Sequence, residues 1–547
     1  MATTEFAKKA TRGYAWNYLY KISEFGLTYL FSTVVIRRFG PEISAPYIVF
    51  ATLAPFLAIV SAFAVDGVLL RYIQRIAGNV PTAEEQFDRI ESLSLPHFLN
   101  TMLAFRLLMI TAVSIIAAIV LILLPIYSPS LRQSFGTLTT FAPQLILYLF
   151  AFGINAFSTY ALTGLLETKR VFISSVISRS LLLGVGLWLV FTQSLSLDAA
   201  INVFVGSFVV SALLTYTSLR HEVRLRFFNE PHRRFSLRTT SRLIRQFLRS
   251  RRYIGAFLAT PLLLYGITTW GNDLLSTVLG KQPDILTMRI MLGEQTKEIG
   301  FYYSATQILF VTEYIFLFGL GGTLVSIFSK LAHEDEKQGR GYTSLAKARK
   351  EIAGFQNVVL LPLCTFVYLF IPKIVTLVYG SAFEPATAMV RYGLIAMIIS
   401  VGLFGGGMQI TSLVAIGKER LVFKNRLSWG IGNIILNIFL IYFFGGMGAL
   451  IGTQYCNAGA CATESGFASK LIGKSMSYQA SLRLFIIAVV AAIIPYELAE
   501  LIPSLPLIVY VGLGAVIDVL LVIGMYIIFR VPEAEIVKKR LRNLMGN

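Results

Sequence analysis

Residues 14–36 read YAWNYLYKISEFGLTYLFSTVVI, an apolar stretch with a polar stripe. Its polar residues are spaced 3, 4, 3 and 4, which places them on one face of a helix: Tyr14, Asn17, Lys21, Glu24 and Thr28. A cation and an anion at membrane depth are unfavourable unless they face a protein interior or a watery cavity. We therefore expect the first helix to line a polar cavity. The alternative is that Lys21 and Glu24 pair only for packing.

Composition places the whole chain in a membrane. Of its 547 residues, 55% are hydrophobic and only 14% are charged, too apolar for an ordinary soluble protein. Apolar stretches long enough to cross ~30 Å of hydrocarbon recur throughout. We predict an all-α polytopic protein with about 14 spans, at 14–37, 46–70, 99–126, 138–164, 170–192, 198–219, 253–279, 301–329, 354–379, 385–416, 424–444, 447–469, 479–498 and 504–529.

The basic residues orient these spans. With the N-terminus in the cytosol, about 33 of the 48 Lys and Arg residues fall on cytosolic segments and about 5 on external ones. The net charge of +19 is then mostly cytosolic and lipid-facing, so we expect no nucleic-acid partner. The predicted location is the cell membrane, with both termini cytosolic.

The chain contains a weak internal duplication. The first span ends in IRRFGPE (36–42) and the seventh in STVLGKQ (276–282), while 165–191 parallels 414–440. The repeat covers six helices, so both copies share one orientation, and parallel repeats of this kind are a transporter design.

The duplication and the charged breaks predict four parts. These are a six-helix lobe (1–219), a cytosolic basic linker (220–252), a second six-helix lobe (253–475), and two extra helices with a basic tail (476–547).

Residues 378–453 carry a family resemblance. Their marks are VYGSAF at 378–383, GKER at 417–420 and GGMGALIGT at 445–453. The run resembles the second half of polysaccharide and oligosaccharidyl-lipid flippases of the multidrug/oligosaccharidyl-lipid/polysaccharide (MOP) exporter superfamily. RRFGPEISAPYIVFATL is similar to the family's FGxxxxGxY connection, with Ala45 where Gly is usual. The resemblance implies a hydrophilic cavity between two six-helix lobes. One departure is 280–300, which reads as a long external segment.

Further polar residues inside the spans are cavity candidates: Asp66, Asn155, Arg179, Tyr265, Thr268, Asn272, Arg391, Asn433, Asn437, Gln454, Asn457 and Glu464. For each of these a structural role is an equal alternative. Lys21 and Arg179, with Arg391, would form a basic lining. Glu24, Asp66 and Glu464 are the acids that could titrate or bind a cation.

Three other charged residues are not assigned to a polar face. Asp273 falls off the polar face of span seven, near its external end. Arg106 and Arg483 lie near helix ends, where long side chains reach the interface.

The 220–252 segment predicts a basic amphipathic helix. Its arginines repeat at 4, 3, 4 and 3: Arg238, Arg242, Arg245, Arg249 and Arg252. Such a helix suits an anionic cytosolic leaflet. A linker held at the interface is favoured over direct contact with a lipid-linked pyrophosphate.

Catalytic and nucleotide-binding motifs are missing from the sequence. It contains no G-x-x-x-x-G-K-[ST], GxSxG or HExxH, and its four histidines make no metal spacing. We predict no enzyme, no metal and no cofactor. Energy would come from the substrate or from an ion gradient, with Na⁺ or H⁺ as the coupling ion.

The predicted function is therefore a flippase for a lipid-linked oligosaccharide. The main alternative is a cation- or proton-coupled antiporter of drugs or metabolites, and a polysaccharide polymerase is less favoured. Expected partners are the lipid-linked sugar, anionic lipids and glycan-assembly enzymes, with the protein itself a monomer.

Overall fold

A computed structural model describes most of the chain. The described residues are 2–76, 94–127, 136, 138–226, 235–249, 261–293, 296–317, 320–475, 478–501 and 505–535, although some side chains within these ranges lie outside the description. Helices account for nearly all of these residues, and no strand occurs among them. The chain divides into two compact units, Met1–Arg38 with Ser44–Thr277, and Phe39–Ile43 with Val278–Asn547.

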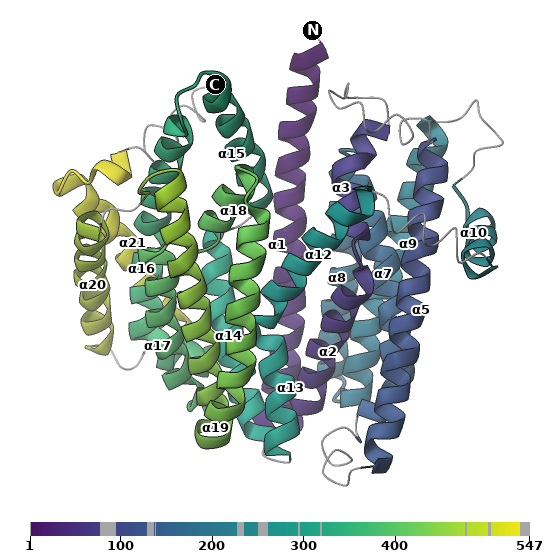
Figure 1. The fold of residues 1–547 in the computed structure, drawn as a ribbon. Helices are drawn as coiled ribbons and strands as arrows, with labels where there is room; N and C mark the ends of the chain where they lie inside the picture. Colours follow the sequence, from purple (N-terminus) through teal and green to yellow (C-terminus); the bar gives the residue numbers. More distant parts are fainter. Residues whose placement is uncertain are drawn as a thin grey trace. The chain divides into compact units, whose positions relative to one another are not determined.

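The first unit is a helical bundle (Figure 1). Its elements are α1 (Ala2–Ile43), α2 (Ala45–Ala62), α3 (Val65–Ile76), α5 (Leu95–Tyr127), α7 (Ala142–Gly164), α8 (Thr168–Phe191), α9 (Leu197–Arg226), α10 (Leu237–Arg249) and α12 (Pro261–Val278). Helices α5, α7, α8 and α9 run side by side, and a buried apolar cluster joins α3, α5 and α7.

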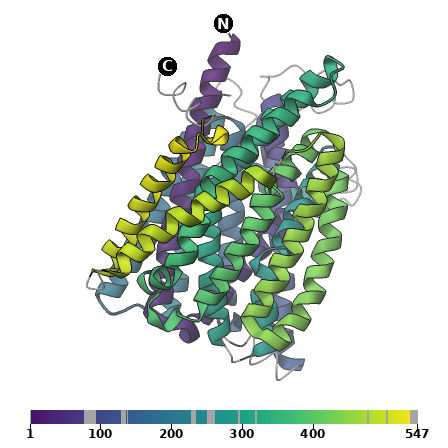
Figure 2. The same ribbon diagram turned by 90° about the vertical axis from the view of Figure 1, so that its left-hand side faces the viewer.

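The second unit is also entirely helical in its described part. Its elements are α13 (Lys281–Leu292), α14 (Thr296–Leu317), α15 (Leu320–Lys337), α16 (Thr343–Val378), η2 (Ser381–Phe383), α17 (Ala386–Met397), η3 (Ile398–Leu403), α18 (Gly407–Ala415), α19 (Glu419–Leu471), α20 (Tyr478–Glu500) and α21 (Leu507–Ile528). The last two helices pack against α16 and each other, and Figure 2 shows this pair in yellow-green and yellow.

The structure confirms an all-α polytopic protein. Ten described helices are long and apolar enough to cross a membrane. One of them, α19, contains the predicted spans 424–444 and 447–469, which meet at Gly445 (φ 56°). The predicted span 46–70 is broken between α2 and α3, where Phe63 (φ 28°) and Ala64 (φ 71°) occupy strained conformations.

Both copies of the duplicated motif mark a change of unit. Residues 39–43 belong to the second unit, which resumes at Val278, just before Gly280. Gly40 breaks α1 with a φ of 76°, and Gly280 separates α12 from α13 in an extended conformation. The Pro41 backbone then packs on Gly300, where any side chain would clash. Gly40 and Gly280, which the duplication aligns, thus each end a helical segment at the same place in the repeat.

The expected external segment 280–300 is different in the structure. Residues 281–292 form α13, which packs against α19 and buries Asp284, Ile285 and Met288 completely. The apolar residues in this stretch recur at helical spacing, which explains why they face a protein interior.

Helix α10 confirms the predicted basic amphipathic helix up to Arg249, whereas Arg252 lies outside the described residues. Its apolar face contacts α5, with Leu243 buried against Ala104. Asn100 anchors its start by accepting the Ser236 N–H at 3.2 Å. The three arginines whose side chains are described face outward: Arg238, Arg242 and Arg245.

Candidate functional site

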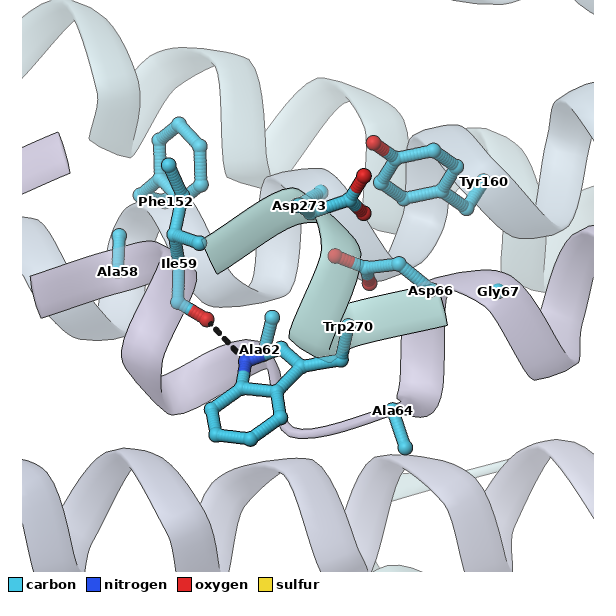
Figure 3. Close-up of a pocket in the computed structure, with 11 residues that line it drawn as sticks. Ala58, Ile59, Ala62, Ala64, Asp66, Gly67, Phe152, Tyr160, Trp270 and Asp273 are labelled. Carbon is cyan, nitrogen blue, oxygen red and sulfur yellow. Dashed lines mark hydrogen bonds between the residues drawn. The ribbon is translucent and has the colours of Figure 1, made fainter. Parts of the chain in front are cut away.

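A cavity of about 280 Å³ opens among α2, α3, α7 and α12 of the first unit (Figure 3). The broken span creates it, because α2 ends before α3 begins in a new direction. The freed carbonyl of Ile59 accepts the indole N–H of Trp270 at 2.8 Å. Phe63, at the break, packs on the Trp270 ring at 5.1 Å between centroids. Helix α12 is thereby attached to the rim of the cavity.

Two glycines bring α12 close to α3. A side chain on Gly67 would meet the Thr269 hydroxyl at 2.4 Å, and one on Gly266 would meet the Ala64 carbonyl at 2.7 Å. Both distances are too short for real contacts, so only glycine permits this approach. The approach places the carboxylates of α3 and α12 in one cavity.

Asp66 and Asp273 point toward one another in this cavity, with the Tyr160 hydroxyl beside them (Figure 3). On α12 the described lining residues are Trp270 and Asp273, three residues apart, so Asp273 points into the cavity from a different face than Thr268 and Asn272. Arg106 corrects the expectation that it reaches the interface, because its side chain is fully buried and its Nη1 lies 3.1 Å from Asp66 Oδ1. An arginine that reached the interface would be exposed, whereas this one balances a carboxylate inside the bundle.

The polar stripe of α1 meets a second buried arginine. Glu24 Oε2 lies 3.5 Å from Lys21 Nζ, and its Oε1 lies 3.8 Å from Arg179 Nη2. Arg179 is held by Ser207, to which Nη1 donates at 2.9 Å, and by the Phe208 ring, 3.8 Å from its Cζ. The Glu24 carboxylate therefore forms ion pairs with two cations, Lys21 and Arg179.

Other predicted residues of the first unit are less engaged. Thr28 donates its hydroxyl to the Glu24 carbonyl at 2.6 Å. Asn17 and Thr268 are half-buried, and Asn272 Oδ1 is buried without a hydrogen-bond partner. Asn155 Oδ1 accepts hydrogen bonds from the hydroxyls of Ser211 and Thr215 and so joins α7 to α9. The side chains of Tyr14 and Tyr265 lie outside the described residues.

The second unit contains a buried polar cluster around Asp284, which we call the Asp284 cluster: Asp284, Tyr302, Asn433, Asn437 and Thr453. Asp284 accepts Asn437 Nδ2 at 2.6 Å on one oxygen, and Thr453 Oγ1 at 2.7 Å together with the Tyr302 hydroxyl on the other. Thr453 Oγ1 also lies 3.1 Å from Asn433 Oδ1. No arginine, lysine or histidine pairs with Asp284 in the described part of the chain.

The Asp284 cluster has more acceptors than donors. The single Thr453 hydroxyl proton faces oxygens of both Asp284 and Asn433, and Asn437 Oδ1 has no donor at all. Gly452 makes room for that amide, since a side chain there would lie 2.0 Å from Asn437 Oδ1. A proton on the carboxylate, or a cation among these oxygens, would correct the imbalance.

The remaining predicted residues of the second unit lie apart from this cluster. Glu464 is fully buried and neutralised by Arg426, whose Nε and Nη2 lie 2.9 Å and 3.2 Å from its oxygens. That pairing favours a structural role over cation binding. Arg391 stacks over the Tyr368 ring at 5.5 Å. Gln454 and Asn457 are half-buried.

Sequence reasoning did not identify Asp284, Tyr302 or Lys281 as site residues. Lys281 lies over the rings of Tyr303 and Phe310, at 4.8 Å and 5.8 Å. The available signal was the spacing of Ile285, Met288 and Leu292, which fits a buried helix face better than an external loop. No group of three or more His, Cys, Asp or Glu side chains within the described ranges is placed to hold a metal.

Comparisons with known proteins address the fold. No family model matches the sequence, and no curated protein does. A solved lipid II flippase MurJ in an inward closed conformation superposes with a TM-score of 0.61 at 13% identity, covering 94% of this chain and 99% of that one. This chain has the fold of MOP-superfamily transporters.

Other transporters of the MOP superfamily have a similar fold. An inward-facing multidrug resistance MATE transporter superposes with a TM-score of 0.55 at 16% identity, covering 83% of this chain and 94% of that one. A MOP transporter from Pyrococcus furiosus gives 0.51 at 15% identity, covering 85% and 95%. A multi-pass membrane transporter architecture is common to all three. At these identities the MOP fold is shared, and the substrate is a separate question.

Proposed function

We propose that the protein is a flippase that moves a lipid-linked oligosaccharide to the external leaflet by alternating access. The observation that carries this proposal is the sharing of Glu24 between Lys21 and Arg179. Two cations on one carboxylate leave a surplus positive charge on the polar face of α1. A pyrophosphate is an anion that such a pair can bind, and membrane-embedded charges of this kind mark substrate pathways.

The two cations differ in a useful way. The Arg179 side chain is 2% exposed and held by its neighbours, so its charge is fixed in place. The Lys21 side chain is 42% exposed, so its ammonium can reach a ligand. A fixed charge and an accessible one together favour a substrate that arrives and leaves.

The cavity beside α12 suits a sugar. Asp66, Asp273 and Tyr160 offer oxygens that can accept hydroxyl protons, and Trp270 contributes an apolar ring. Its volume of about 280 Å³ lies just below the ~300–1,000 Å³ typical of pockets for drug-sized molecules. A single sugar unit is the occupant that this size and lining favour.

Chain coverage also supports the flippase. The lipid II flippase covers 94% of this chain, whereas the MATE transporter covers 83%. A flippase of this kind would work in the cell membrane with both termini cytosolic, as a monomer beside glycan-assembly enzymes.

A cation-coupled antiporter is the second candidate, and one observation favours it. Asp273 has no basic partner among the described residues, and it faces Asp66. Two carboxylates in one cavity can share a proton or bind a cation. Arg106 already neutralises Asp66, which weakens this reading.

We further propose that the Asp284 cluster binds the coupling ion. Its surplus acceptors and its lack of a basic partner suit Na⁺, which takes oxygen ligands, or H⁺. Replacing Na⁺ by choline, at pH 6 and at pH 8, should lower the melting temperature of the purified protein if Na⁺ is the ion. The shift should vanish in Asp284→Asn and persist in Asp198→Asn, which alters an exposed acid in the first turn of α9. A wild-type protein insensitive to both Na⁺ and pH would contradict the ion site.

Binding to purified protein tests the substrate class. Three compounds distinguish the candidates: a polyprenyl pyrophosphate, the matching uncharged polyprenol, and a lipophilic cation. The flippase reading predicts that only the pyrophosphate raises the melting temperature. Lys21→Gln should weaken its binding by about tenfold or more, the equivalent of one charge-assisted hydrogen bond.

The control for that variant is Lys169→Gln, which removes the same charge at the exposed start of α8. It should leave pyrophosphate binding unchanged. Stabilisation by the lipophilic cation alone, lost in Asp273→Asn, would instead establish the antiporter reading.

A further inference from the structure

Helix α21 carries an acid at the centre of a membrane-spanning segment. Asp518 lies eleven residues after Leu507 and ten before Ile528, so each end of the helix is about 15 Å away. Its neighbours on the outer face are exposed aliphatic residues that suit lipid: Val516, Val519, Leu520 and Ile523. Asp518 itself is 4% exposed, so it points into the protein.

The buried face of α21 places Asp518 against α16 and α20. One turn before it, Gly514 packs so tightly on Phe370 that a side chain would lie 2.7 Å from the ring. One turn after it, Val522 belongs to an apolar cluster with Leu361 and Ala488. Asp518 is therefore enclosed between two tightly packed apolar layers.

No basic side chain in the described elements faces this carboxylate. Between Glu351 and Tyr368, α16 carries only one titratable residue, Cys364. Between Arg483 and Tyr496, α20 carries none. Among the residues that the structure describes, Asp518 makes no hydrogen bond or ion pair, and its Oδ1 is buried without a partner there.

The titratable groups that flank the surroundings of Asp518 on α20 and α21 already have partners of their own. On α21, the Tyr510 hydroxyl donates to Glu500, and the Tyr526 hydroxyl donates to the Val358 carbonyl, each at 2.9 Å. Near the start of α20, Arg483 lies 3.4 Å from Glu533. None of these groups neutralises a charge on Asp518.

We propose that Asp518 is an intramembrane proton-binding site, formed where α21 packs on α16 and α20. An ionised carboxylate without a partner is strongly disfavoured in such a place, whereas a carboxylic acid is tolerated. The bound proton keeps α21 docked, and the acid can ionise only when water or a cation reaches it. This site does not depend on the proposed substrate.

A membrane-embedded carboxylic acid has a distinctive reactivity. It adds to dicyclohexylcarbodiimide: its proton passes to a carbodiimide nitrogen, and its oxygen bonds to the central carbon. An acyl shift from oxygen to nitrogen then gives a stable N-acylurea where water is excluded. The residue gains the mass of one reagent molecule, and nothing leaves.

The experiment treats the purified full-length protein, reconstituted in vesicles, with this lipid-soluble carbodiimide at pH 7. Peptide mass spectrometry should find the adduct on Asp518. The lipid-soluble carbodiimide should label Asp518 about tenfold or more strongly than a water-soluble carbodiimide does, because hydrocarbon excludes the polar reagent. Labelling by the lipid-soluble reagent should fall as the pH rises.

Matched variants make the result specific. Asp518→Asn should remove the adduct and leave the melting temperature within a few degrees of wild type, because it replaces one neutral side chain by another. Glu533→Gln should leave labelling of Asp518 unchanged. The proposal is overturned if wild-type Asp518 gives no adduct, or if both reagents label it equally. The wild-type result decides the question even if Asp518→Asn does not fold.

Discussion

Nη2 of Arg179 lies 3.8 Å from Oε1 of Glu24, and the arginine is the more deeply buried of the two, at 2% against 25% side-chain exposure. Glu24 therefore orients toward a cation that cannot move away, while Lys21 reaches the same carboxylate from the next turn of α1. An arriving anion would compete with Glu24 for both cations.

This arrangement makes Lys21 a functional residue in our account. Lys21→Ala should abolish transport while the protein remains folded and inserted, because Arg179 still neutralises Glu24. Lys21→Arg should retain part of the activity. Transport assays and thermal unfolding of the same preparations check both points. Full recovery of transport in Lys21→Ala/Glu24→Ala would show that the pair serves packing only.

The Asp66–Arg106 pair should be a strong stabilising contact. Asp66→Asn leaves a fully buried guanidinium without a counter-charge and should lower the free energy of unfolding by about 3 kcal/mol. Replacing Arg106 by Leu in the same chain should recover most of that loss. The control is Glu222→Gln, whose partner Arg170 is 30% exposed and whose loss should be about 1 kcal/mol. Equal losses at the two sites would contradict this prediction.

The sequence predicted the fold more completely than the site. Apolar length predicted an all-α polytopic protein, because each span must satisfy its own backbone in lipid, and ten of the described helices are long and apolar enough to cross a membrane. Lys21, Glu24 and Arg179 do lie together, with the Glu24 carboxylate between the two cations, and their role in a substrate cavity stays a prediction. Arg106 was wrongly assigned to the interface, because its partner Asp66 is forty residues away and spacing along one helix does not reveal it.

The surroundings of Asp273 and Asp284 also could not be predicted from spacing along one helix. Their surroundings depend on where α12 ends and α13 begins, at the glycine that the duplication aligned with Gly40. The sequence marked that glycine but did not show that a buried helix follows it.

Asp335 should make stability depend on pH. Its Oδ2 accepts the N–H groups of Ser344 and Leu345, at 2.8 Å and 3.1 Å, and so caps the start of α16. Burial alone would raise the pKa of Asp335, but these hydrogen bonds and nearby Arg340 outweigh it and hold the pKa below its ordinary value. A lowered folded-state pKa contributes stability above the unfolded-state pKa and loses it as the pH falls through the folded-state pKa.

We therefore expect Asp335→Ala to lower the free energy of unfolding by about 1 kcal/mol at pH 7, the usual contribution of a helix cap. The difference from wild type should shrink below about pH 4. Thermal unfolding across this range measures it. Glu334→Gln, which alters an exposed carboxyl beside it, should change little. A difference from wild type that grows at low pH would contradict the capping role.

The exposed arginines of α10 should bind anionic lipid. Because the apolar face of α10 is docked on α5, its basic face is free to meet phosphate headgroups. In nanodiscs, added anionic lipid should stabilise the wild-type protein by about 1 kcal/mol per arginine. Replacing Arg238, Arg242 and Arg245 by Gln should remove most of that effect. Without anionic lipid, the two proteins should unfold alike, and an equal lipid response in both would contradict the assignment.

We propose that the protein moves a lipid-linked oligosaccharide outward, and the distribution of that lipid between the two leaflets tests this function most directly. In cells depleted of the protein, we predict that lipid-linked oligosaccharide accumulates on the cytosolic leaflet while external glycan falls, and that wild-type protein restores both but Lys21→Ala does not. A polymerase would instead leave single repeat units reaching the outer face. Unchanged amounts on both leaflets, with increased sensitivity to lipophilic cations, would contradict the flippase and favour the antiporter.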